Sequence, residues 1–166
     1  NGVPYTDASG NKLLGSFGKE EATQNELGWK GSLNEGKTSV AIAYFDIDYK
    51  DRAFQVVAPN PGGPGLIEYV TNIGDSEQNG LELEVAMKAT DNLTLSMAAG
   101  WVNSDFSEGT ILADGTDLSG LTPSGTIDNS FLIGADYATT IYDGTDFNLG
   151  IQWSYTGQGV GMPVVG

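Results

Sequence analysis

The chain has 166 residues, including 24 glycines but no cysteine or histidine, and its 22 acidic and 7 basic residues give a net charge of −15. Without Cys and His it has no disulfide scaffold, thiol catalysis, thiolate or imidazole metal site, or His-based triad. Its negative charge opposes nucleic-acid binding, which needs a footprint of Lys and Arg. We therefore expect a single domain at most that is not an enzyme, holds no cofactor and binds no nucleic acid.

The beginning of the chain carries no signature of a targeting peptide. It starts at Asn1 and shows no basic stretch followed by an apolar core, so we expect a mature or internal segment. The longest uncharged apolar run in a strand-like region, residues 40–45, is far shorter than the ~20 residues of a membrane helix. A membrane β-barrel remains possible, because its strands alternate between two faces.

Alternation of apolar and polar residues predicts six strands, near residues 26–33, 38–50, 80–88, 93–102, 127–141 and 147–156. In the first, the best phase places Leu27, Trp29, Gly31 and Leu33 on one face. In the second, one face is predicted to carry Ala41, Ala43, Phe45, Ile47 and Tyr49, and the other Tyr44, Asp46, Asp48 and Lys50. The other four strands show the same two-residue period, and each has one strongly apolar face.

The predicted connections alternate between short turns and long excursions. Residues 34–36, 89–92 and 143–146 are short and rich in Asn, Asp and Gly, which is typical of hairpin turns. Residues 51–79 and 103–125 form long polar, Gly-rich excursions between them. Short turns at one end and long loops at the other are typical of outer-membrane β-barrels.

Three stretches carry a resemblance to a known family: FGKEEATQNELGWKGSL (17–33), VAIAYFDIDYKDRAFQ (40–55) and VTNIGDSEQNGLELEVAMKATDNLTLSMAAGWVNSDF (70–106). In this order they resemble the C-terminal half of the barrel of TonB-dependent receptors. The third stretch contains that family's N-x-G, G-x-E-x-E and N-L-T-L elements, at 72–74, 80–84 and 92–95. Over 121–155 the match rests on alternation and hairpin spacing. The chain departs from a complete receptor in lacking a plug domain, a TonB-binding segment and a C-terminal aromatic residue.

The resemblance implies an all-β fold, with residues 1–166 forming an antiparallel transmembrane β-barrel segment of about six strands within a barrel of the roughly 22-stranded type. It also implies the bacterial outer membrane and active uptake of a chelated metal, an oligosaccharide or a peptide, with energy from the TonB complex. Six strands are too few to close a membrane barrel, so we expect the edge strands to pair with chain outside this sequence. The expected partners are the lipid bilayer, the rest of the barrel and its plug, the TonB complex and an unidentified substrate.

Two sets of strand residues follow from this interpretation. The lumen-facing carboxylates could guide a cationic substrate, but we favour contacts with Lys and Arg of the plug, since buried carboxylates need partners. The residues expected on the lumen face are Asp46, Asp48, Glu82, Glu84, Asp128 and Asp136. Those expected to face lipid are Leu81, Leu83, Val85, Leu93, Leu95, Met97, Phe131, Ile133, Leu149, Ile151 and Trp153.

Loops on a rigid scaffold commonly carry binding, so substrate contacts are expected in the long excursions. The candidates are Arg52, Tyr69, Asp105, Phe106, Asp114 and Asp117. For Asp114 and Asp117 a role in shaping turns is the stronger interpretation. Residues 46–51 and 113–117 contain clustered carboxylates, but neither has the spacing of an EF-hand calcium loop, and we expect no metal site.

Two other functions remain open at this stage. One is a porin or small eight-stranded barrel, with further strands in residues 1–25 and 157–166. The other is a secreted acidic β-sandwich that acts as an adhesin or binding module. Detergent dependence would separate the sandwich from both barrels, and the length of the gene would separate the receptor from the small barrel.

Overall fold

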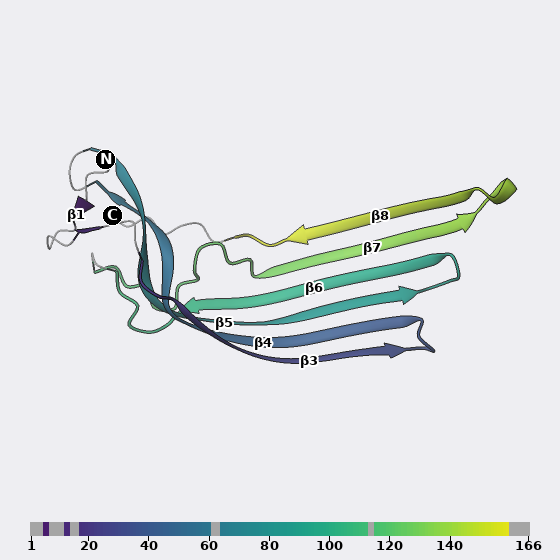
Figure 1. Ribbon diagram of the computed structural model, residues 1–166, viewed down its shortest axis with the longest axis horizontal. Helices are drawn as coiled ribbons and strands as arrows, with labels where there is room; N and C mark the ends of the chain where they lie inside the picture. The colour runs from purple at the N-terminus through teal and green to yellow at the C-terminus, as the bar shows by residue number, and fades with distance from the viewer. Residues whose placement is uncertain (1–4, 7–11, 14–16, 61–63, 113–114, 160–166) are drawn as a thin grey trace.

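The computed structural model describes residues 5–6, 12–13, 17–60, 64–112 and 115–159. Its main feature is a six-stranded antiparallel sheet in the order β3-β4-β5-β6-β7-β8, in which every strand pairs with its neighbour in sequence (Figure 1). The strands are β3 (Glu21–Leu33), β4 (Thr38–Pro59), β5 (Leu66–Lys88), β6 (Leu93–Phe106), β7 (Asn129–Thr140) and β8 (Asp146–Thr156). Strands β1 (Tyr5–Thr6) and β2 (Lys12–Leu13) form a separate small sheet. Among the described residues no helix is long and apolar enough to cross a membrane.

The three short turns lie at one end of the sheet, as the sequence predicts (Figure 1). At the β3–β4 turn, Asn34, Glu35 and Gly36 all have positive φ, a conformation that Asn and Gly tolerate best. The β7–β8 turn contains the short 3-10 segment η1 (Tyr142–Gly144). The β4–β5 and β6–β7 connections lie at the opposite end. We call these the turn end and the loop end.

Strands β4 and β5 are much longer than the sequence analysis predicts, so the interpretation of residues 51–79 as a loop is wrong. The chain bends at an irregularity where Tyr49 pairs with Ser76 and Arg52 with Gly74, and pairing then continues to Pro59 and Leu66. Asp51 takes a positive φ of 51° there. A bulge of this kind bends a strand without ending it, so charged residues at 50–52 mark a bend here rather than a turn. Likewise β6 continues through Phe106.

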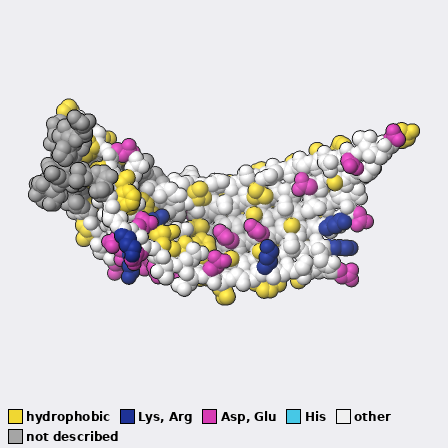
Figure 2. Space-filling model, in the orientation of Figure 1, with side chains coloured by type: hydrophobic (Ala, Val, Ile, Leu, Met, Phe, Trp, Pro, Cys, Tyr) yellow, Lys and Arg dark blue, Asp and Glu magenta, His cyan; other side chains and the backbone are white. Residues whose placement is uncertain are grey.

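The register gives the sheet an apolar and a polar face. On the apolar face, one row crosses all six strands as Trp29, Ile42, Leu83, Ala99, Phe131 and Tyr155, and the next as Gly31, Val40, Val85, Met97, Ile133 and Trp153. The polar face carries Lys30, Ala41, Ala43, Glu82, Glu84, Thr94, Ser96, Ser130, Gly134, Asp136, Asn148, Gly150, Gln152 and Ser154. Figure 2 shows acidic side chains gathered toward the middle of the long strands, with mostly uncharged, non-hydrophobic surface around them.

The predicted division of residues 38–50 into two faces is correct, but the face that carries Asp46 and Asp48 was assigned to the wrong side of the sheet. Tyr44 pairs with Leu81, so it lies on the apolar face, and Phe45 pairs with Gly80 on the polar face. Both faces of this strand carry apolar side chains, so its own alternation does not show which set of residues lies on the apolar face of the sheet. The pairing with β5 shows it, because Leu81, Leu83 and Val85 share that face.

Buried residues are few along the sheet and gather at the loop end. There, Val56, Ile73, Phe106 and Leu118 are buried, and Phe54, Tyr69 and Leu112 pack against them. We call these seven residues the rim cluster. They come from β4, β5, β6 and the β6–β7 connection, so the connection is packed against the sheet. The long strands carry their apolar side chains on an open face instead, with Ile151 73% and Leu149 60% exposed.

Candidate functional site

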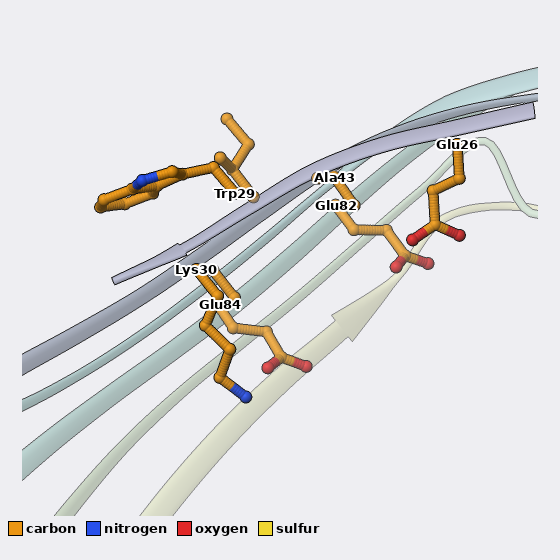
Figure 3. Close-up of a pocket in the computed structure, with 9 residues that line it drawn as sticks. Glu26, Trp29, Lys30, Ala43, Glu82 and Glu84 are labelled. Atoms are coloured by element: carbon orange, nitrogen blue, oxygen red, sulfur yellow. The ribbon is translucent and has the colours of Figure 1, made fainter. Parts of the chain in front are cut away.

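Glu26, Glu82 and Glu84, which we call the acidic group, lie around a shallow hollow of about 300 Å³ on the polar face. Register places Lys30, Ala41 and Glu84 in one row, and Gly28, Ala43 and Glu82 in the next. The small residues between the charged ones leave the hollow open. In Figure 3, Glu26, Lys30, Glu82 and Glu84 extend from one side of the sheet, whereas Trp29 extends from the other.

These carboxylates form no ion pair within the described part of the chain. Its ion pairs are Lys19 with Glu21 and Lys88 with Asp91, the latter at 3.7 Å, and neither involves the acidic group. Glu26 accepts a hydrogen bond from Gln24 Nε2 at 3.1 Å. The sequence analysis names Glu82 and Glu84 but misses Glu26 and Lys30, which the phase of the first strand could have placed on the same face. The arrangement places several carboxylates on one polar face, where they can accept hydrogen bonds from cationic side chains or from a polar ligand.

The six carboxylates predicted for the lumen do not share a face. Asp136 pairs with Thr94 and Gly150, on the polar face with Glu82 and Glu84. Asp46 and Asp48 pair with Asn79 and Glu77 on the apolar side, beyond Tyr44, so their assignment is wrong. The physical reason is the reversed phase of β4. Asp128 precedes β7 and its carbonyl accepts the Val102 amide at 2.8 Å.

The residues predicted to face lipid are brought together on the apolar face. All eleven lie there by register: Leu81, Leu83, Val85, Leu93, Leu95, Met97, Phe131, Ile133, Leu149, Ile151 and Trp153. Toward the loop end, Trp101 and Phe131 pack edge to face with centroids 5.3 Å apart, and Phe131 and Tyr155 lie 6.2 Å apart. Aromatic residues at one end of an apolar band are typical of the interfacial girdle of a membrane barrel.

The candidate ligand residues at the end of β6 and in the β6–β7 connection have different surroundings. Phe106 is 4% exposed and packs edge to face on Phe54 at 5.2 Å, so the expectation that it contacts a ligand is wrong. Its ring is instead part of the rim cluster, because the connection folds back over it. Asp105 pairs with Glu77 and lies on the side of Asp46 and Asp48. Asp114 lies outside the described residues.

Asp117 shapes the connection. Its carboxylate accepts the Ser119 amide at 2.9 Å, and hydrogen bonds from Ser119 hold the pKa of Asp117 below its usual value. Ser119 Oγ in turn accepts the Gly109 amide at 2.9 Å. Thr110 Oγ1 donates to the Asp75 carbonyl at 3.3 Å, which fastens the connection to β5. Gly74 makes room for this contact, because a Cβ there would lie 3.1 Å from Thr110 Cγ2.

Arg52 lies over two aromatic rings, one of which, Phe54, belongs to the rim cluster. Its guanidinium carbon lies 4.3 Å from the centroid of Tyr49 and 4.7 Å from that of Phe54. Its Nη1 donates to Ser76 Oγ at 3.1 Å, and Ser76 is 1% exposed. Tyr69, the other candidate on these strands, packs against the rim cluster. Sequence reasoning finds Arg52 by its charge but not Tyr49 and Ser76, which only the pairing of β4 with β5 places beside it.

No group of three or more Asp or Glu side chains in the described ranges is arranged to hold a metal ion. The described ranges include residues 46–51 but not the whole of 113–117, since Asp114 lies outside them.

Comparisons with known proteins agree with this geometry at the level of the family. The family model described as TonB dependent receptor-like, beta-barrel, matches residues 1–162. No curated protein and no solved structure matches the chain.

Proposed function

Because the chain belongs to the β-barrel family of TonB-dependent receptors, which are non-enzymatic transporters of the bacterial outer membrane, we propose that it serves the active uptake of a scarce nutrient. The substrate class is a chelated metal, an oligosaccharide or a peptide. The observation that carries the proposal is the division of one sheet into a face with a broad apolar band toward the turn end and a polar face whose carboxylates form no ion pair among the described residues. A transporter wall needs both, because one side meets lipid and the other lines the route of a polar solute.

The two outer strands support a place within a larger barrel. Strands β3 and β8 each have one sheet neighbour among the described residues. In the hydrocarbon region each unpaired backbone group costs several kcal/mol, so a bare edge is not viable there. We propose that both edges pair with strands outside this sequence.

The acidic group is proposed to hold the plug. Glu26, Glu82 and Glu84 present carboxylates from neighbouring positions on the polar face, and Asp136 presents another farther along the same face, toward the turn end. A plug that supplied Lys and Arg side chains would give these carboxylates charge-assisted hydrogen bonds. Glu82→Gln with Glu84→Gln in the full-length receptor should weaken plug retention, measured as faster proteolysis of the plug. Lys37→Gln, in the β3–β4 turn, is the control and should leave plug cleavage unchanged.

The uptake proposal is tested in cells. A strain without the gene, with and without its complementing copy, is grown on a panel of chelated iron sources, oligosaccharides and peptides as limiting nutrients. At least one nutrient should support growth only when both the gene and TonB are intact. Growth that depends on the gene but not on TonB would contradict active uptake and would favour a passive porin.

A further inference from the structure

We propose that Arg52 is an anion-binding residue on the lumen wall, which engages a carboxylate or phosphate group of the transported substrate. The inference rests on the uptake function proposed above, and it narrows the substrate to a molecule that carries such a group. Arg52 is the only arginine in the sequence. Four observations on the described residues lead to this assignment.

First, the guanidinium is positioned before any ligand arrives. Its carbon lies over the rings of Tyr49 and Phe54, at 4.3 and 4.7 Å from their centroids, and Ser76 Oγ accepts from Nη1 at 3.1 Å. Phe54 itself packs on Phe106 of the rim cluster at 5.2 Å. An arginine fixed in this way loses little conformational entropy when it binds an anion.

Second, Arg52 has no carboxylate partner. The described residues place no Asp or Glu oxygen within salt-bridge distance of its guanidinium, in a chain that carries 22 acidic residues. The bond to Ser76 uses one of five N–H groups, which leaves enough donors for bidentate contact with a carboxylate or phosphate. Most arginines of an acidic protein could find an internal carboxylate partner. The absence of such a partner here leaves the guanidinium available for an external anion.

Third, the sheet separates Arg52 from four of the nearby acids. Asp46, Asp48, Glu77 and Asp105 all lie on the apolar side by register. On the polar side, the same rows of β4, β5 and β6 carry the uncharged residues Phe45, Ile47, Tyr49, Ser76, Gln78, Gly80, Val102, Ser104 and Phe106. The acids on the polar side come from the edge of the sheet at β3, where Glu26 shares the Phe45 row and the Glu20 carboxylate accepts the Ala53 amide at 2.8 Å. An anion that approaches Arg52 over β5 and β6 therefore meets the guanidinium without passing a carboxylate of those strands.

Fourth, Arg52 lies where the strands bend toward the loop end. The irregularity between Tyr49 and Arg52 sets it beyond the Phe45 row of the polar wall. A solute that enters the barrel from the loop end would pass this position before it reaches the acidic group. Arg52 would thus bind an anionic group of the substrate near the loop end. The carboxylates of the acidic group lie farther along the same polar face.

The test uses chemical modification of Arg52 in the purified full-length receptor, with malonate and inorganic phosphate as probes. Phenylglyoxal modifies accessible guanidinium groups, and mass spectrometry of the peptide around Arg52 gives the rate. Either probe should slow modification at least fivefold relative to sodium chloride of equal ionic strength, and sucrose should have no effect. Protection by malonate alone assigns a carboxylate, and protection by phosphate alone assigns a phosphate.

A variant pair tests positioning. Tyr49→Leu removes one stacking ring and should reduce the protection at least threefold. Tyr44→Leu, on the opposite face of the same strand, should retain it. Equal protection in both variants would contradict the claim that the Tyr49 ring positions the Arg52 guanidinium for anion binding.

Two outcomes overturn the proposal. One is modification that neither probe slows. The other is an Arg52 that is unreactive in the full receptor but reactive after deletion of the plug, which would assign the plug as its partner. Each is distinct from a failure of the uptake proposal, which is measured separately as growth that does not require TonB.

Discussion

The ring of Phe45 lies across Gly80 on the polar face of the sheet. A Cβ placed on Gly80 would stand 2.4 Å from Phe45 Cζ and 2.6 Å from the Trp101 carbonyl oxygen. At Gly80 of β5, the space that a Cβ would need is therefore occupied by the Phe45 ring of β4 and the Trp101 carbonyl of β6. The Phe45 ring covers the backbone at Gly80, and a larger residue at position 80 would push the ring and the neighbouring strands away. An aromatic side chain here compensates for the missing side chain of a strand glycine.

Gly80→Ala should destabilise the barrel by about 1 to 3 kcal/mol, the usual range for an overpacked site. The Trp101 carbonyl is backbone and has little room to yield, so adding Phe45→Leu should recover only part of the loss. Gly28→Ala is the control, since its Cβ would meet nothing nearer than 3.4 Å. Reversible folding of the full-length protein into vesicles measures both. Equal stability of the two variants would contradict the close packing at Gly80.

Ile151→Arg tests the apolar face. Arginine near the bilayer midplane costs about 2 to 4 kcal/mol on a lipid-facing strand position. Gln152→Arg, one residue along β8 and on the polar face, should cost much less. Folding into vesicles again gives both values. A loss below about 0.5 kcal/mol for Ile151→Arg would mean that this face meets water.

Leu118→Ala tests whether the rim cluster holds the β6–β7 connection. Leu118 is 1% exposed, and truncation of a buried leucine typically costs about 2 to 5 kcal/mol. The loss should be local and appear as faster proteolytic cleavage in residues 107–128, with the strands intact. Leu121→Ala, at a position 53% exposed, is the matched control. Cleavage that is equally fast in both variants would show that the connection is not anchored by the cluster.

The Asp117 turn should weaken in acid. The pKa of Asp117 lies below the usual value of an aspartate because hydrogen bonds from Ser119 favour the carboxylate. A lowered folded-state pKa contributes stability that is present above the unfolded pKa and is lost as pH falls through the folded one. Hydrogen exchange of the Ser119 amide, corrected for intrinsic rates, should therefore accelerate below about pH 4. In Asp117→Asn that pH dependence should disappear, and its persistence would assign the effect to another group.

The sequence predicts the strands and turns because the two-residue period and the Asn-Asp-Gly turns are local signals. It could not predict that Phe45 faces the polar side, since Val40, Ile42 and Tyr44 form an equally apolar alternative that only pairing with β5 selects. The continuation of β4 beyond Asp51 was missed for a related reason. A bulge and a turn use the same residue types, and only a long-range partner strand distinguishes them.

The candidate site was partly predictable. Glu82 and Glu84 follow from alternation and from the family motif. Phe106 was misplaced because an aromatic residue at a strand end fits a ligand contact and a buried contact equally well. Its burial by Leu118 depends on a connection that folds back over it, and no local pattern in residues 107–128 reveals that fold.

The central claim, that one face of this sheet meets lipid and the other lines the barrel, is tested most directly by spin labels along β8. The sequence has no cysteine, so single cysteines at 148 to 154 introduce one label each into this segment of the full-length receptor in vesicles. Labels at 149, 151 and 153 should be readily accessible to oxygen dissolved in lipid and protected from a water-soluble nickel chelate. Labels at 148, 150, 152 and 154 should lack that oxygen accessibility. Seven labels with equal nickel accessibility, or the opposite phase, would contradict the account.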